Sequence, residues 1–122
     1  MAETDIALKE AMTIEGALGV ALVDYGSGMA LGVLGGAGLD LTVAAAGNTD
    51  LVRAKMRTME MLGLPGGIED ILVTLTKQYH LIRPLTSRSG QGLFLYLALD
   101  RSRANLAMAR HRLKQVEGTL EV

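Results

Sequence analysis

The order in which helical and extended patterns follow one another constrains this chain more than any single motif does. Apolar residues recur at helical spacing in three segments, namely residues 4–12, residues 40–62 and the stretch after Asp100. Apolar runs typical of strands lie between them, at 17–24, 29–34, 79–85 and 93–99. A further half-buried or edge strand is predicted over residues 68–76. The sequence therefore predicts an α+β fold of order αββαβββα, which we expect to form one domain over residues 1–122.

Several residues set the expected limits of these elements. Asp40 is a candidate N-cap for the central helix, and the glycines and proline of residues 63–67 end it. Asp100 is a candidate cap for the final helix. That helix has an apolar stripe for packing on one side of a sheet, made of Leu106, Ala109, Leu113, Val116 and Leu120. Basic side chains are expected to border the stripe, namely Arg101, Arg103, Arg110, Arg112 and Lys114. The unbroken apolar runs of the first two strands indicate a sheet covered on both faces.

The central helix has more apolar surface than one sheet requires. At 100° per residue its apolar side chains span an arc of roughly 200°, whereas a helix on one sheet needs a little over about 100°. The centre of the arc holds Leu41, Ala44, Ala45, Leu51, Val52, Met56, Met59 and Leu62. A symmetry-related copy of the helix is the simplest cover for the remainder. Asn48 and Lys55 fall inside the arc, where they either reach water or set the register of a helix–helix contact.

Composition excludes several classes of function. The net charge of −1 and the aromatic content of 3% provide neither a basic field nor a stacking platform for nucleic acid. The chain contains no cysteine, which excludes disulfides and thiolate chemistry. The longest uncharged stretch, residues 25–39, is too short and too rich in glycine to span a bilayer. We therefore expect a soluble, cytoplasmic protein that neither binds nucleic acid nor inserts into a membrane.

The residues of catalytic and cofactor sites do not occur in recognisable patterns. Residues 32–38 are rich in glycine but lack the Gly-Lys-Ser/Thr ending of a phosphate-binding loop, so a turn with positive φ explains them better. His80 and His111 have no triad or metal-ligand spacing around them. We expect no catalytic residue, no metal site and no cofactor.

Three segments resemble the Roadblock family, named for the dynein light chain. They are residues 14–24 (IEGALGVALVD), residues 69–76 (EDILVTLT) and residues 79–85 (YHLIRPL). The similarity spans roughly residues 8–118. The chain is most similar to the small bacterial Roadblock proteins of actinobacterial operons, which also encode a sensor-kinase-like protein and a Ras-like GTPase.

The resemblance implies a five-stranded antiparallel sheet of order 2-1-5-4-3, with the terminal helices on one face and the central helix on the other. It also implies a homodimer in which third strands pair and central helices pack together. The expected interface comprises Leu41, Ala45, Asn48, Val52, Lys55, Met56, Met59, Ile71, Leu72, Val73 and Thr74. Pairing of the third strand would protect an edge that otherwise invites aggregation.

Roadblock proteins act as scaffolds and regulators of small GTPases and have no active site of their own. The resemblance therefore implies a non-catalytic dimer that binds a Ras-like GTPase and modulates its nucleotide cycle, with the sensor-kinase-like protein as a further partner. Arg53, Arg57 and Glu60, on the polar flank of the central helix, are candidate contacts for the GTPase. The alternative is a small-molecule sensor of the profilin-like or PAS-like type. Such a sensor requires a cavity, for which a pocket containing His80 would be the evidence.

Overall fold

The computed structural model of the chain describes residues 3–36, 38–87 and 89–121. Over these residues it has the predicted order of elements: α1 (Thr4–Met12), β1 (Ala17–Asp24), β2 (Met29–Gly35), α2 (Leu41–Leu62), β3 (Ile71–Thr74), β4 (Gln78–Pro84), β5 (Leu93–Asp100) and α3 (Leu106–Thr119). The strands form one antiparallel sheet in the order β2-β1-β5-β4-β3. The predicted fold class and strand order are confirmed.

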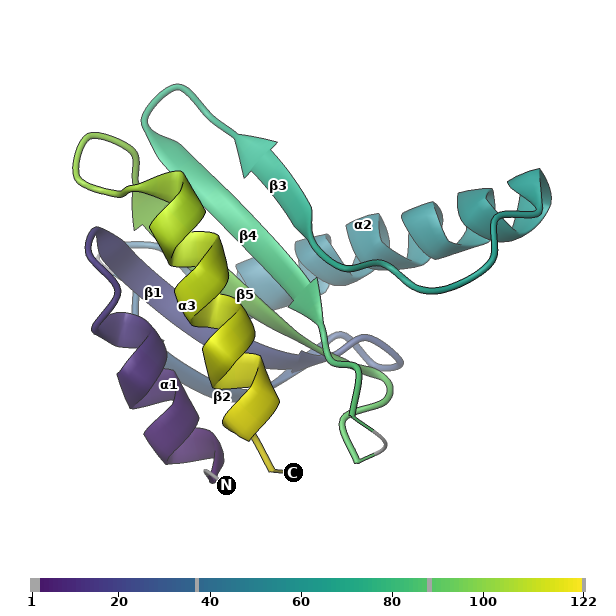
Figure 1. Cartoon of the computed structure of the whole chain (residues 1–122), viewed down its shortest axis with the longest axis horizontal. Helices are drawn as coiled ribbons and strands as arrows, with labels where there is room; N and C mark the ends of the chain where they lie inside the picture. The colour runs from purple at the N-terminus through teal and green to yellow at the C-terminus, as the bar shows by residue number, and fades with distance from the viewer. Residues whose placement is uncertain (1–2, 37, 88, 122) are drawn as a thin grey trace.

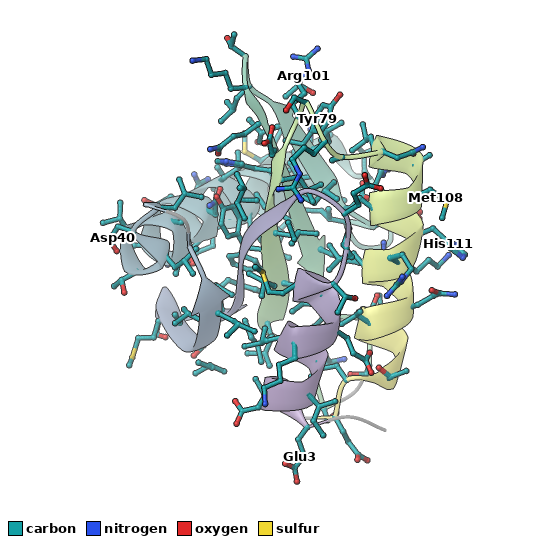
Figure 2. The ribbon with its side chains drawn as sticks, turned by 90° about the vertical axis from the view of Figure 1, so that its left-hand side faces the viewer. Glu3, Asp40, Tyr79, Arg101, Met108 and His111 are labelled. Carbon is teal, nitrogen blue, oxygen red and sulfur yellow. The ribbon has the colours of Figure 1, made fainter. Side chains whose placement is uncertain are left out.

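The molecule has three layers, with α1 and α3 on one face of the sheet and α2 on the other (Figure 2). Each face has its own apolar core. The core under α1 and α3 includes Leu8, Leu22, Leu97 and Leu113. The core under α2 includes Val52, Phe94 and Tyr96. Because β1, β4 and β5 contribute to both cores, these strands read in the sequence as nearly continuous apolar runs.

Local capping explains the limits of α2. The side chain of Asp40 accepts hydrogen bonds from the backbone N–H groups of Thr42 (3.0 Å) and Val43 (3.1 Å), as predicted for an N-cap. Gly63 ends the helix in the left-handed conformation at φ 68°. In the glycine-rich segment before α2, Gly35, Gly36 and Gly38 all have positive φ, which confirms the turn that the sequence predicts there.

The start of the final helix differs from the prediction. Asn105, not Asp100, is the N-cap of α3, and its side chain accepts a hydrogen bond from the N–H of Met108 at 3.1 Å. Asp100 is the last residue of β5. Its Oδ1 accepts a hydrogen bond from the hydroxyl of Ser102 at 2.8 Å, within the turn that follows the strand. Arg101 and Arg103 therefore lie in this turn and not on the helix. The predicted apolar stripe of α3 is confirmed, since its residues pack into the core under α1 and α3.

The expectation that both faces are covered holds for the sheet but only in part for β2, whose Leu34 and Ala30 pack against the two cores. Along this strand exposed residues alternate with half-buried ones, and Met29, Leu31 and Val33 are exposed. Val33 pairs with the buried Ala21 and so points to the α2 side of the sheet. The reason is that β2 is the last strand at its edge, and α2 does not extend over its outer side chains.

Candidate interaction surface

The strand β3 is an open edge of the sheet. It pairs with β4 only, in a register that sets Ile71 opposite Ile82 and Val73 opposite His80. The N–H of Leu75 donates to the carbonyl oxygen of Gln78 (2.8 Å) in the hairpin turn. Because hydrogen-bonded pairs alternate in an antiparallel ladder, the backbone groups of Leu72 and Thr74 face away from β4. This edge can accept another strand.

The second half of α2 extends beyond the sheet, past β3 (Figure 1). The buried residues of the helix end at Val52. Beyond that point large apolar side chains are exposed, notably Met61 (80%) and Leu62 (65%). An exposed apolar helix end beside an open strand edge is a contiguous surface suited to another protein.

The predicted interface residues divide into two groups. Leu41, Ala45 and Val52 are buried in the core of the chain's own sheet. The others retain accessible surface: Asn48, Met56, Met59, Ile71, Leu72 and Val73 are half-buried, while Lys55 and Thr74 are exposed. The amide of Asn48 donates to the carbonyl oxygen of Ala44 at 2.8 Å, so this polar group is already bonded within its own helix.

Arg53, Arg57 and Glu60 are all exposed on the second half of α2. Their spacing of four and three residues places them along one side of the helix. The structure therefore brings the three predicted partner contacts together on the helix that also carries Met61. Their charged groups are available to a partner from solvent.

His80 takes part in a hydrogen-bonded chain on the α2 side of the sheet. Its Nε2 lies 2.7 Å from Oε1 of Gln78 and its Nδ1 lies 3.1 Å from the hydroxyl of Tyr96. An amide oxygen only accepts, so Nε2 carries the hydrogen and Nδ1 accepts from Tyr96 when the ring is neutral. The two rings meet edge to face, with centroids 5.3 Å apart. Burial lowers the pKa of His80 and raises the pKa of Tyr96 to about 12. Since both ring nitrogens are engaged within the chain, this arrangement does not favour a ligand site at His80.

Two ion pairs attach α3 to the sheet. Arg83 at the end of β4 pairs with Glu117 at 2.8 Å, and both side chains are 7% exposed. Arg110 makes a bidentate pair with Asp70, just before β3, at 2.9 and 2.8 Å. The hydrogen bonds and charge of Asp70 raise the pKa of Arg110. Neither pair was predicted from the sequence. The only signal was that one residue of each pair, Arg83 and Asp70, stands in or next to an otherwise apolar strand segment.

Two searches over the described residues bear on other classes of site. No group of three histidine, aspartate or glutamate side chains in this part of the chain is placed to hold a metal ion. None of the helices that the structure describes is both long enough and apolar enough to span a membrane.

Comparison with known proteins identifies the fold. No protein-family model matches the chain, and no curated protein matches its sequence. Solved structures do match. A Roadblock/LC7 domain from Streptomyces avermitilis is 16% identical, with a TM-score of 0.79 over 97% of this chain and 94% of that one. Myxococcus xanthus MglB is 21% identical, with a TM-score of 0.74 over 93% and 77%. MglC from the same organism is 24% identical, with a TM-score of 0.60 over 93% and 92%. The chain therefore has the Roadblock/LC7 fold.

Proposed function

We propose that the chain works as a homodimeric, non-catalytic platform that binds a Ras-like small GTPase and modulates its nucleotide cycle in bacterial signalling. The Roadblock/LC7 fold supports this proposal, because the Roadblock proteins that the sequence resembles scaffold and regulate small GTPases. A sensor-kinase-like protein is a further proposed partner.

One observation carries the dimer. The open edge of β3 and the extended, apolar half of α2 lie on the same side of the molecule (Figure 1). A two-fold axis beside β3 would pair the outward backbone groups of Leu72 and Thr74 with those of a second copy. The same operation would bring the two α2 helices across the joined sheet, where Met59 and Leu62 would leave water. One symmetric contact would thus cover both the open edge of β3 and the exposed apolar half of α2.

The residues that are buried within the single chain add little area to such a contact. The proposed interface therefore rests on Met56, Met59 and Leu62 of α2 and on the backbone of β3. Methionine side chains adapt well to a partner surface because they are flexible and polarizable. In this arrangement Arg53, Arg57 and Glu60 remain available to the GTPase.

The oligomeric state is tested first, by light scattering coupled to size-exclusion chromatography. Thr74→Pro removes an outward N–H from the β3 edge and is expected to shift the protein toward monomer, whereas Thr74→Ala keeps that N–H and the dimer. Leu62→Lys is expected to weaken the dimer as well, because Leu62 (65% exposed) lies three residues from Met59 on the same side of α2. Val43→Lys is its matched control, because Val43 is also exposed on α2 (67%) but lies in the half over the sheet. A protein that is monomeric at all concentrations would overturn the dimer.

The GTPase is tested by affinity capture from the native lysate, once with a non-hydrolysable GTP analogue and once with GDP. Mass spectrometry identifies the retained proteins. A small GTPase held in one nucleotide state is the expected result, and its hydrolysis and exchange rates with and without the purified dimer then show what is modulated. The charge reversal Arg53→Glu with Arg57→Glu is expected to abolish capture. Retention of no GTPase in either state argues against the regulator function.

A further inference from the structure

A cleft lies between α3, the end of β4 and the segment that leads into β3, on the face of the sheet opposite α2. Its volume is about 310 Å³. The polar side chains that line it are Glu69, Asp70, Arg83, Arg110, His111 and Lys114. The three from α3 lie on one side of the helix, since Lys114 is four residues from Arg110 and three from His111. The cleft is thus walled by a helix on one side and by the sheet on the other.

Arg83 provides a buried cation in the wall of this cleft. The residue is 5% exposed, and its Nε donates to Glu117. Its Nη1 and Nη2 have no hydrogen-bond partner in the described part of the chain. No fully buried polar side-chain atom among the described residues lacks a partner, so these two nitrogens retain contact with solvent. A guanidinium that is held at Nε and belongs to the lining of a cleft, with unused donors at its terminal nitrogens, is preorganised to bind an acceptor.

Most carboxylate oxygens around the cleft already accept hydrogen bonds within the chain, whereas several N–H donors do not. Both carboxylate oxygens of Asp70 are bonded to Arg110. Both oxygens of Glu117, behind Arg83, are bonded as well, to Arg83 and to Thr86. By contrast, Nη1 of Arg110 and the exposed ammonium of Lys114 make no hydrogen bond with a described residue. Glu69, at the rim, is exposed. The cleft therefore offers mostly unused N–H donors.

We propose that this cleft is a binding site for a small oxyanion, a phosphate or carboxylate group carried by a small molecule. The Nη groups of Arg83 bind the anion from the sheet side, and Lys114 and Nη1 of Arg110 bind it from α3. Charge-assisted hydrogen bonds from a guanidinium fork match the geometry of both anions. Asp70, Glu117 and Glu69 together balance the charges of the three cations, so binding depends on the unused hydrogen-bond donors and not on net charge, and a dissociation constant on the order of 1 mM is expected.

The cleft opens on the α1–α3 face, away from the apolar surface of α2, but Glu69 and Asp70 in its lining directly precede β3, whose outer edge is proposed to pair in the dimer. Binding of an anion would couple the end of β4 to the middle of α3. A small molecule bound in the cleft would not contact Arg53, Arg57 or Glu60, the residues proposed for the GTPase.

The experiment is a nuclear magnetic resonance titration of the full chain with inorganic phosphate and, separately, with acetate, at constant ionic strength and pH. The signals followed are the Nε–H of Arg83 and the amide N–H of Thr86. Saturable shifts of both signals are the expected result. Saturation by phosphate alone assigns a phosphate site, and saturation by acetate assigns a carboxylate site. Shifts that stay linear in anion concentration for both anions overturn the proposal.

Variants distinguish a built site from a general charge effect. Lys114→Gln is expected to weaken binding several-fold, whereas Lys77→Gln removes the same charge in the β3–β4 turn and is expected to leave it unchanged. Arg83→Lys keeps a cation beside Glu117 but loses the fork, and binding should fall below detection. Circular dichroism and thermal melting establish that each variant is folded. Equal effects of the two lysine substitutions, or undiminished binding by a folded Arg83→Lys protein, overturn the site.

Discussion

Arg83 and Glu117 form a buried ion pair although they are 34 positions apart in the sequence. The Nε of Arg83 donates to Oε1 of Glu117 at 2.8 Å, and Oε2 accepts from the hydroxyl of Thr86 at 2.9 Å. One carboxylate thereby joins the last turn of α3 to the end of β4 and to the residues that follow it. The orientation of α3 on the sheet depends on this contact as well as on its apolar stripe.

Removal of one partner of this pair should be costly. Glu117→Ala leaves the guanidinium of Arg83 buried without its counter-charge, and we expect the free energy of unfolding to fall by about 3–5 kcal/mol. Urea denaturation measures this change. The double variant Arg83→Met with Glu117→Leu removes both charges and fills similar volume, so its stability should lie close to that of the native chain. A loss below about 1 kcal/mol in the single variant would mean that water reaches the pair.

His80 should make folding stability depend on pH. Burial lowers its pKa in the folded chain below the ordinary value of 6.5, so the unfolded chain binds the proton more tightly. The contribution of neutral His80 is complete above pH 6.5 and decreases as the pH falls below that value. We expect the urea midpoint of the native chain to decrease between about pH 7.5 and about pH 5.5.

Comparison with a variant isolates this contribution from that of the carboxylates. His80→Gln removes the titrating group, and its midpoint should change less over the same pH range. His111→Gln, which replaces an exposed histidine at the surface of α3 (Figure 2), is the substitution control measured alongside it. Parallel profiles for native and His80→Gln proteins would show that the imidazole is as well solvated when folded as when unfolded.

The regular elements could be predicted because their signals are local. The limits of α1 and β1 agree with the prediction, and Asp40 and Gly63 bound α2 by capping chemistry that a short stretch of sequence contains. Asp100 and Asn105 are both good capping residues. The choice between them depends on the pairing of Asp100 with Gln78 across two strands, which extends β5 as far as Asp100.

Contacts between distant residues had no comparable local signal. Nothing near Arg83 in the sequence indicates that Glu117 lies beside it in the fold. The exposure of Leu31 and Val33 likewise depends on where α2 crosses the sheet, which the apolar run of β2 does not specify. The surface proposed for interaction was expected from the wide apolar arc of α2. The arc alone could not show that the apolar side chains in the first half of α2 pack into the core of the same chain.

One glycine inside α2 and the glycine that ends it should respond in opposite directions to the same substitution. Gly47 lies inside the helix, and an added Cβ would meet nothing within 4 Å. Gly47→Ala should therefore stabilise the chain by about 0.5–1 kcal/mol, by reducing the entropy of the unfolded chain and improving helix propensity. Gly63→Ala also meets no atom but places Cβ at φ 68°, and should destabilise by about 1–2 kcal/mol. Thermal unfolding measures both; a destabilising Gly47→Ala would indicate a close helix contact in the oligomer.

The exposed edge β2 should promote aggregation. The strand contains no charged residue, and the unpaired backbone on its outer side together with Met29, Leu31 and Val33 offers an apolar template for another strand. Leu31→Lys places a charge on this edge and should lower the rate of aggregation, measured by light scattering during incubation above room temperature. The matched control is Met108→Lys, because Met108 on α3 is similarly exposed (57% against 53%) but lies away from any strand edge. Equal protection by both variants would show that added net charge, and not the β2 edge, controls aggregation.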